Sequence, residues 1–345
     1  MRARFKGVIL AGVHQWADTG LGRLVPRPLV PVIDQPLIEH VVAWMRGAGL
    51  NEATVCANSD TATIRRALGT GQPESVAIDY CEDVMPRGPA GCTRDAAEGT
   101  DAEFLVVVDT TIIPSAIDLK SMLDSHVAQD AALTVAVTRS GDEDQIDNGH
   151  LAPAGVYVFS RRAIEAVSAS GYQDIKESLI PKLYSQGDKV LTHVIATRVP
   201  RVSCTSTYLT ACTWVLNRRL QQGEAVGAGY KRIGAALVHS SAKVDPSVQL
   251  VGPVLVGPES SIGAGAKIVG PSSIGPRCKV ETGGIVCRSH LWEGARIGPK
   301  SVLDRCIVTF GADLPQGTAQ SNRVFTSRHR EQRDPDSHRP AKRFM

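Results

Sequence analysis

The sequence lacks the features that mark several common classes of protein. Its eight cysteines include no Cys-x-x-Cys pair and no histidine at metal-ligand spacing, so a zinc site is not expected. No apolar run approaches the length of a membrane span, and the run GVILAG at residues 7–12 is too short for a signal peptide. The G-x-G-x-x-G pattern of dinucleotide sites does not follow Gly12. These absences favour a cytoplasmic protein with buried thiols in a reducing compartment.

An excess of charge of either sign is also missing. Lysine and arginine number 38 and aspartate and glutamate 35, which leaves a formal net charge of +3. This balance gives no reason to expect nucleic acid or a membrane as a partner. What the chain does have is length, because 345 residues with 43% hydrophobic side chains can build two modest domains.

Residues 7 to about 220 alternate between apolar runs of strand length and amphipathic helical segments. Strand-like runs are GVILAG, ATVCAN, SVAIDY, EFLVVVD, LTVAV and GVYVFS. Helical segments between them repeat apolar residues every three or four positions, as in PLIEHVVAWMRGAG and AIDLKSMLDSHVAQ. The alternation predicts an α/β domain over residues 1–222 with a largely parallel sheet. Ligands of such sheets bind at the carboxyl ends of strands, so we expect the site in the loops after VILAG and FLVVVD.

A different period begins after a predicted linker at residues 223–236. Apolar residues then recur every six positions, at Val238, Val244, Leu250, Val256, Ile262, Ile268, Ile274, Val280, Val286 and Trp292. The pattern shifts by one to Leu291, Ile297 and Leu303. This hexapeptide repeat predicts a left-handed parallel β-helix over residues 237–320, with one apolar side chain per short strand pointing inward.

Residues 321–345 form a polar, basic segment interrupted by two prolines, and we expect it to be a disordered tail. It carries seven lysines and arginines against three acidic residues. A contact with an acidic partner and a merely solvated tail both remain open.

The order of these two domains resembles the sugar-1-phosphate nucleotidyltransferases that carry a C-terminal left-handed β-helix, in particular the mannose-1-phosphate guanylyltransferase-like branch. Leu-Ala-Gly at residues 10–12 and PRPLVP at residues 26–31 keep the spacing of the family's phosphate loop and P-K-P-L-x-P motif. PRGPAG at residues 86–91 is similar to its nucleobase-binding turn, and KESLIPKL at residues 176–183 to its E-x-x-x-x-P-x-L helix. The resemblance implies a Rossmann-like three-layer domain followed by the β-helix.

The same resemblance implies a reaction that joins a sugar 1-phosphate to a nucleoside triphosphate and releases pyrophosphate, with Mg²⁺ if the protein is active. Asp109 is the candidate metal ligand, and Arg27, at the family's lysine position, is a candidate catalytic cation. A shifted loop using TGLGRL would add Arg23 as a second catalytic cation. The candidate nucleotide-binding residues are Leu10, Ala11, Gly12, Glu82, Pro86, Gly88, Ala90 and Gly91.

Several positions depart from the family pattern. When the chain is aligned with the family's phosphate loop without gaps, Val13 and Gln15 stand at two glycine positions, Trp16 at the threonine and Ala17 at the arginine. Each replacement adds a side chain where the phosphates should lie or removes a donor. Asp109 falls one position early, which would turn its carboxylate to the other face of the sheet unless a bulge corrects it. The alternative role for Asp109 is to cap the following turn. Pro153 stands near an expected asparagine, and Ser203 replaces a second metal-side acid.

These departures favour a homologue that binds a nucleoside triphosphate or a nucleotide sugar with weakened or lost catalysis. An active Mg²⁺-dependent enzyme using Arg23, Arg27 and Asp109 is the alternative. Acyl transfer by His239 or His290 of the β-helix is a third reading. Because repeat prisms offer flat faces, we also expect the β-helix to form a homo-oligomer, or a hetero-oligomer with an active relative.

Overall fold

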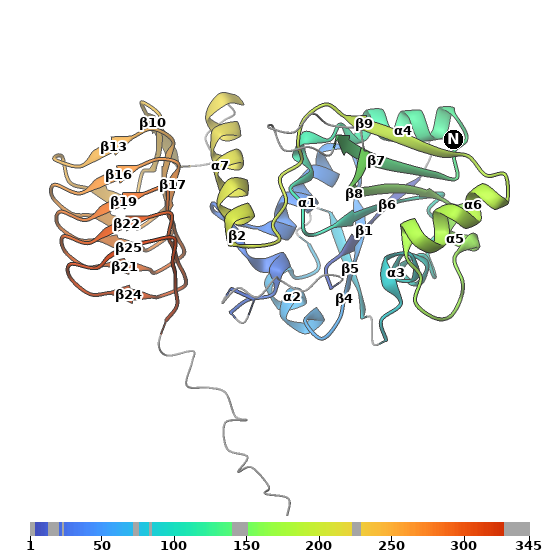
Figure 1. The fold of residues 1–345 in the computed structure, drawn as a ribbon, viewed down its shortest axis with the longest axis horizontal. Coiled ribbons are helices and arrows are strands. Elements are labelled where there is room, and N and C mark those ends of the chain that lie inside the picture. The colour runs from blue at the N-terminus through green and yellow to red at the C-terminus, as the bar shows by residue number, and fades with distance from the viewer. Residues whose placement is uncertain are drawn as a thin grey trace, which may run out of the picture. The chain divides into compact units, whose positions relative to one another are not determined.

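The computed structural model describes residues 4–12, 21–22, 24–71, 76–82, 85–139, 151–222 and 229–327. The chain divides into two compact units. One comprises Met1–Val30 and Gln35–Tyr208, and the other Pro31–Asp34 and Leu209–Met345. Figure 1 shows the α/β elements of the first and the short stacked strands of the second.

The first unit is built on a seven-stranded sheet of order β5-β4-β1-β6-β8-β7-β9. Only β8 runs antiparallel to its neighbours, and the other pairs are parallel. All six strands predicted from the apolar runs are present, which confirms the largely parallel sheet. The strands are β1 (Phe5–Leu10), β4 (Glu52–Ala57), β5 (Ala77–Glu82), β6 (Phe104–Asp109), β7 (Leu133–Arg139), β8 (Leu151–Ser160) and β9 (Val190–Ile195).

Helices cover both faces of this sheet and make it the middle of three layers (Figure 1). One face packs against α1 (Leu37–Gly47), α2 (Thr61–Leu68) and α4 (Leu119–Ala128), whose buried side chains join one apolar core. The other face packs against α3 (Gly88–Ala96), α5 (Arg161–Ala166) and α6 (Ile180–Ser185) in a second core. Shorter elements of this unit are η1 (Arg27–Leu29), β3 (Gln35–Pro36), η2 (Pro114–Ala116) and η3 (Ile175–Leu179). By the division of the chain, β2 (Pro31–Val32) and most of α7 (Thr205–Gln222) are counted with the second unit.

The second unit contains three parallel sheets of short strands that stack into a β-helix. Their orders are β10-β11-β14-β17-β20-β23-β26, β12-β15-β18-β21-β24 and β13-β16-β19-β22-β25, and only the β10–β11 pair is antiparallel. The bounds are β10 (Tyr230–Ile233), β11 (Ala236–His239), β12 (Lys243–Val244), β13 (Gln249–Val251), β14 (Val254–Val256), β15 (Ser261–Ile262), β16 (Lys267–Val269), β17 (Ser272–Ile274), β18 (Lys279–Val280), β19 (Ile285–Cys287), β20 (His290–Leu291), β21 (Arg296–Ile297), β22 (Val302–Asp304), β23 (Ile307–Val308), β24 (Asp313–Leu314), β25 (Ala319–Ser321) and β26 (Val324–Phe325).

The hexapeptide period sets the inward ladder of the β-helix, with one correction. Val256 pairs with Ile274 at a spacing of 18 residues, and Ile274 then pairs with Leu291 at a spacing of 17. Leu291 rather than Trp292 therefore occupies the core position, because that coil is one residue shorter. Trp292 is buried beside the ring of Phe310, with ring centroids 4.9 Å apart.

Two predicted boundaries need correction. Part of the predicted linker forms β10, whose residues pair with β11. The first residues of the predicted tail form β26, which pairs with β23 and places Phe325 against the β-helix core. Edge strands add main-chain hydrogen bonds at the two ends of the stack, which composition alone does not reveal. The rest of the tail, residues 328–345, lies outside the described residues.

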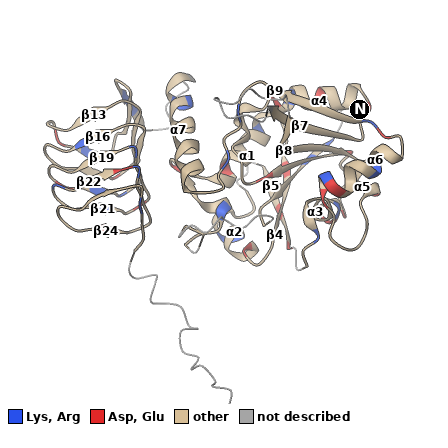
Figure 2. Ribbon diagram, in the orientation of Figure 1, with Lys and Arg blue, Asp and Glu red and all other residues tan. Residues whose placement is uncertain are grey.

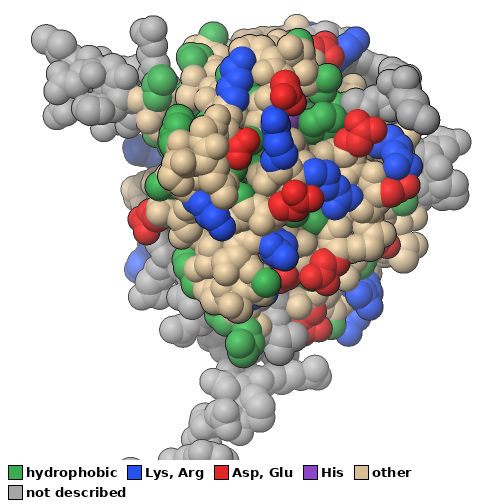
Figure 3. All heavy atoms as spheres, turned by 90° about the vertical axis from the view of Figure 1, so that its right-hand side faces the viewer, with side chains coloured by type: hydrophobic (Ala, Val, Ile, Leu, Met, Phe, Trp, Pro, Cys, Tyr) green, Lys and Arg blue, Asp and Glu red, His purple; other side chains and the backbone are tan. Residues whose placement is uncertain are grey.

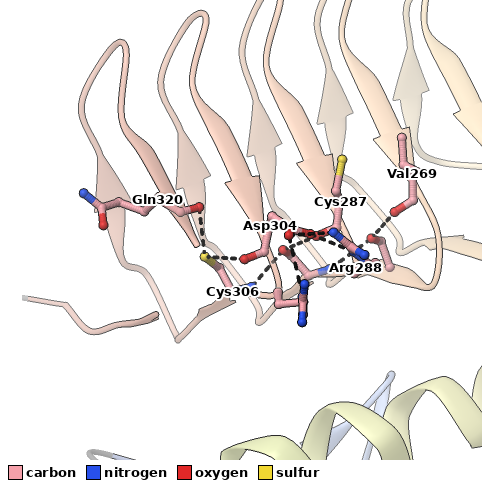
Figure 4. Close-up of polar contacts among 9 residues, drawn as sticks. Val269, Cys287, Arg288, Asp304, Cys306 and Gln320 are labelled. Carbon is pink, nitrogen blue, oxygen red and sulfur yellow. Dashed lines mark hydrogen bonds and ion pairs between the residues drawn. The ribbon is translucent and has the colours of Figure 1, made fainter. Parts of the chain in front are cut away.

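Exposed charges on both units occur in mixed groups. On the β-helix, Arg288 forms two hydrogen bonds to the Asp304 carboxylate, of 2.8 and 2.6 Å, and Cys306 Sγ lies 3.4 Å from the Asp304 carbonyl (Figure 4). Basic and acidic residues are scattered among one another along the ribbon (Figure 2), and their side chains are intermixed on the face drawn in Figure 3. The described residues of that face therefore form no large patch of one sign.

Candidate functional site

A cavity of about 310 Å³ lies in the α/β unit, where β1 and β6 end. This is the edge of the sheet at which the sequence predicts a ligand, and two of the predicted residues, Leu10 and Asp109, line it. The complete lining is Leu10, Pro89, Asp109, Pro153, Gly155, Tyr157, Asp174, Ile175, Lys176, Glu177 and Arg201.

Asp109 lines the cavity despite its early position in the sequence. It is the last residue of β6 and pairs with Leu10 in a β1–β6 register that has no bulge. Leu105 and Val107 belong to the core under α3 and α5. Because side chains alternate along a strand, Asp109 lies on that same face. The one-residue offset of Asp109 from the family pattern predicts that its carboxylate turns to the other face of the sheet, but Asp109 lines the cavity.

The Asp109 carboxylate also caps a turn, as the alternative interpretation predicts. Its Oδ1 accepts a hydrogen bond of 2.9 Å from the backbone N–H of Thr111. Its Oδ2 lies 3.9 Å from Nη1 of Arg201. The same Arg201 nitrogen donates to Thr111 Oγ1 over 3.1 Å. One carboxylate, one guanidinium and one hydroxyl thus form a connected group on the cavity wall.

Tyr157 and Gly155 bring β8 close to this group. Burial of the phenol, together with the nearby Asp109 carboxylate, raises the pKa of Tyr157 to about 12. The phenol therefore keeps its proton at neutral pH and remains a hydrogen-bond donor. Gly155 has a φ of +86°, and a Cβ there would lie 3.4 Å from the Cβ of Asp109. A larger residue at this position would strain the backbone, while its Cβ would be in ordinary van der Waals contact with Asp109.

The opposite rim is the turn η3. Asp174 Oδ1 accepts hydrogen bonds from the backbone N–H groups of Lys176 (2.6 Å) and Glu177 (2.9 Å), which fixes the start of the turn. Pro181 stands at the beginning of α6 and has no N–H to donate, so the preceding turn is a wide π-helical one. Lys176 and Glu177 remain exposed at the rim.

The predicted nucleobase turn is packed differently from expectation. Gly88, Ala90 and Gly91 belong to the first turn of α3 and are buried, with Ala90 at 0% exposure. Two backbone hydrogen bonds fix this turn: the N–H of Ala90 donates to Gln173 O (3.0 Å), and the N–H of Gln173 donates to Arg87 O (2.7 Å). The turn therefore reaches the cavity through Pro89 alone.

Two further residues predicted to bind the nucleobase do not line the cavity. Pro86 is exposed, and Glu82 is exposed at the end of β5.

The phosphate-loop candidates are only partly described. Ala11 N donates to Cys56 O (2.8 Å), and a Cβ on Gly12 would lie 2.9 Å from the Asn58 nitrogen, so this position requires glycine. Neither of the two lines the cavity. The proposed rescue cation Arg23 and residues 13–20 lie outside the described residues.

Arg27 is buried in η1, away from the cavity lining but within electrostatic reach of it. Burial lowers the pKa of its guanidinium, Asp109 opposes that shift, and Arg201 adds to it. Arg27, Asp109 and Arg201 therefore interact as a set of two cations and one anion.

The residues at this edge do not fit the Mg²⁺ site that the resemblance implies. Mg²⁺ is commonly held by one or two carboxylates together with substrate phosphates. Ser203 stands at the second acidic position, and its hydroxyl lies 3.3 Å from Thr207 Oγ1. An ion on Asp109 Oδ2 would sit beside the Arg201 guanidinium, and like charges this close repel each other even in partly screened surroundings. Within the described ranges no three or more His, Cys, Asp or Glu side chains gather as a metal site.

The structure buries one of the two histidines considered as a base for acyl transfer. His290 is buried inside the β-helix unit, its Nδ1 lies 2.8 Å from Ser273 Oγ, and burial lowers its pKa to about 4. His239 contacts Ser241 Oγ at 2.8 Å and the ring of Tyr230. A buried imidazole is not accessible to a substrate, and the structure does not bring the two histidines together as a site.

Arg201, Tyr157 and Glu177 are the functional candidates that sequence reasoning missed. The signal for Glu177 was weak, because three residues separate it from Pro181 instead of the four of the E-x-x-x-x-P-x-L pattern. Arg201 carried no such signal, because its place beside Asp109 depends on contacts between segments some ninety residues apart.

Comparisons with known proteins agree with this architecture. Residues 6–165 match the family described as nucleotidyl transferase. The chain is 25% identical over 265 residues to a mannose-1-phosphate guanylyltransferase of Mycobacterium tuberculosis, covering 71% of this chain and 72% of that protein. It is 26% identical over 219 residues to the low-salt glycan biosynthesis nucleotidyltransferase Agl11 of Haloferax volcanii, covering 55% and 60%. A glucose-1-phosphate thymidylyltransferase of Mycolicibacterium smegmatis is 24% identical over 251 residues, covering 65% and 86%.

Among the described residues, no helix combines the length and the apolar character needed to span a bilayer.

Proposed function

Since residues 6–165 match the family described as nucleotidyl transferase, we propose that this chain binds a nucleotide or a nucleotide sugar in the cavity of its α/β unit and transfers nucleotidyl groups weakly or not at all. The observation that carries the proposal is the composition of the cavity wall. Donors and acceptors suited to a sugar phosphate line the cavity, and Asp109, the candidate metal ligand, faces Arg201 there. Outside this lining, Ser203 stands where the resemblance implies a second metal-side acid.

The chemistry of the reaction explains why binding can outlast turnover. Nucleotidyl transfer needs cations and N–H groups around phosphate oxygens whose charge is redistributed in the transition state. The loop that supplies the N–H groups in the family carries Val13, Gln15 and Trp16 in this chain. Binding of the ground state asks only for charge, donors and shape, which the Asp109, Tyr157 and Arg201 side of the cavity supplies.

The rim of the cavity suggests how a sugar would be held. Carboxylates accept hydrogen bonds from hydroxyl groups, and Glu177 and Asp174 both line this side. Asp174 Oδ1 already accepts two hydrogen bonds from the backbone of its own turn, so the exposed Glu177 carboxylate has more acceptor capacity to offer a sugar. The names of the relatives point to mannose and glucose phosphates as the first compounds to test.

Isothermal titration with GTP, GDP-mannose and the thymidine and uridine counterparts tests the proposal. We expect at least one nucleotide sugar to bind, and Glu177→Gln to weaken it roughly 10-fold through the loss of charged hydrogen bonds. Glu165→Gln, on the exposed surface of α5, is the matched control and should bind as the natural chain does.

A pyrophosphate-release assay with Mg²⁺ and a panel of sugar 1-phosphates separates the proposal from its alternative. We expect release close to background. Rapid Mg²⁺-dependent release by the purified chain would establish an active enzyme instead. In the titration, the absence of both a heat of binding and a thermal shift with every nucleotide would contradict the proposed binding.

Assembly through the β-helix belongs to the same proposal. Exposed apolar side chains on its strands, Val251 and Val302 in one sheet, support a subunit contact there. The partner would be a second copy of this chain or an active relative.

A further inference from the structure

Arg201 reaches the cavity because the segment that carries it is tied to the residues after β6. The N–H of Ile113 donates to Pro200 O (2.9 Å), and the N–H of Val202 donates to Thr111 O (2.6 Å). These two bonds flank an antiparallel bridge between Ile112 and Arg201. The backbone of Arg201 is therefore held in fixed register with the turn that Asp109 caps.

The guanidinium of Arg201 uses one nitrogen for its two contacts. Nη1 bonds Thr111 Oγ1 and faces Asp109 Oδ2, and no described residue is recorded as a hydrogen-bond partner of Nε or Nη2. The side chain is 43% exposed, against 13% for Asp109. The arginine is thus held through Nη1, and it lines the cavity with a partly exposed side chain. A guanidinium offers planar paired donors that match two phosphate oxygens.

The position of this cation is the one where the resemblance leads one to expect a metal ion. Both a divalent ion and a guanidinium neutralise the carboxylate that ends β6, and both offer positive charge to a phosphate. They cannot share Asp109 Oδ2 without repelling each other. Arg27 adds a second, buried positive charge that interacts with the same pair.

We infer that Arg201 takes the place of the divalent metal in this cavity, so that the diphosphate of a nucleotide sugar binds to a built-in guanidinium and does not require Mg²⁺. This inference rests on the proposed function and adds the identity of the phosphate-binding group. The anion recognised is a phosphate or diphosphate ester, and Arg201 is its positioning and charge-neutralising contact.

Titration of GDP-mannose and the thymidine and uridine nucleotide sugars, in parallel in EDTA and in Mg²⁺, tests the inference. We expect dissociation constants that agree within about twofold between the two buffers. Arg201→Gln should weaken binding roughly 10- to 100-fold in both, since a charged hydrogen-bonded contact is lost. Arg201→Lys keeps the charge without the paired donors, so its dissociation constant should lie between those of the natural chain and of Arg201→Gln. Arg198→Gln, an exposed arginine on the same segment, is the matched control and should bind normally.

Circular dichroism checks that each variant is folded. If Arg201→Gln does not fold, Arg201→Lys is used in its place to test the inference. Mn²⁺ titration followed by electron paramagnetic resonance gives a second reading, and we expect no ion bound to the ligand-free chain at this cavity. Binding that appears only with Mg²⁺, or a folded Arg201→Gln that binds normally, overturns the inference and leaves the proposed function standing. Absence of nucleotide binding in both buffers overturns the proposed function and the inference together.

Discussion

At the scale of single residues, the cavity depends on how one carboxylate is shared. Asp109 holds the turn through Oδ1 and faces Arg201 through Oδ2, while Arg27 interacts with both from below the surface. A buried arginine needs a nearby negative charge, because a charge removed from water without a partner is costly. We therefore expect Asp109 to contribute to the stability of the fold as well as to the cavity wall.

Replacement of Asp109 by asparagine tests this double role. Asp109→Asn keeps an acceptor for the Thr111 N–H but removes the charge between two guanidinium groups, and we expect a loss of about 1–3 kcal/mol in the free energy of unfolding. As a control, Asp101→Asn breaks an ion pair with Arg4 in which the aspartate side chain is 79% exposed. This change should alter the free energy of unfolding by less than about 0.5 kcal/mol. Urea unfolding of both variants provides the measurement. Equal effects would contradict a structural role for Asp109.

At the scale of elements, the first turn of α3 shows how the small residues of the PRGPAG motif can be explained by packing. Gly88 has a φ of +73°, and a Cβ there would lie 2.6 Å from Gln173 O. The small residues of PRGPAG allow this close approach between α3 and the loop before η3. Their glycines are explained by packing, and only Pro89 of the motif lines the cavity.

Gly88→Ala tests that packing against a matched glycine. Gly99 has nearly the same φ, +74°, but a Cβ there would meet nothing within 4 Å. Alanine at either position costs about 1–2 kcal/mol from the left-handed backbone. At Gly88 the clash with Gln173 adds to that cost, so Gly88→Ala should lower the melting temperature more than Gly99→Ala. Thermal unfolding followed by circular dichroism compares them, and equal shifts would show that the close approach is not rigid.

At the scale of the whole molecule, each unit buries one neutral histidine. Burial lowers the pKa of His126 in the α/β unit and of His290 in the β-helix unit to about 4. An unfolded histidine titrates near 6.5, so between pH 6.5 and 4 the unfolded chain binds more protons than the folded one. The stability that these neutral side chains provide is fully present above pH 6.5 and is lost as the pH falls towards 4.

His290→Asn isolates the contribution of the β-helix to this acid sensitivity. A full shift of this size corresponds to about 3 kcal/mol across that range, with a slope of at most about 1.4 kcal/mol per pH unit. The variant should start less stable at pH 7.5 and then lose less stability on acidification than the natural chain. Urea unfolding at several pH values between 7.5 and 4.5 measures both slopes. Parallel slopes would mean that His290 remains unprotonated in the unfolded chain or is already charged in the folded one.

The sequence by itself determined the two architectures, because each depends on a local period. Alternating apolar runs and helical segments specify the α/β layers, and the six-residue repeat specifies the β-helix ladder. It also predicted the edge of the sheet at which the cavity lies, since parallel strands bring their carboxyl ends together. The one-residue change of coil length, which seats Leu291 in place of Trp292, is visible only when strands are paired.

The tertiary structure alone decided the chemistry of the site. Whether Asp109 faces the cavity depends on its register with Leu10, and whether it pairs with a metal or with Arg201 depends on a bridge to Ile112 from a distant segment. Contacts of this kind leave no period in the sequence, because they join residues whose spacing along the chain has no bearing on their distance in space.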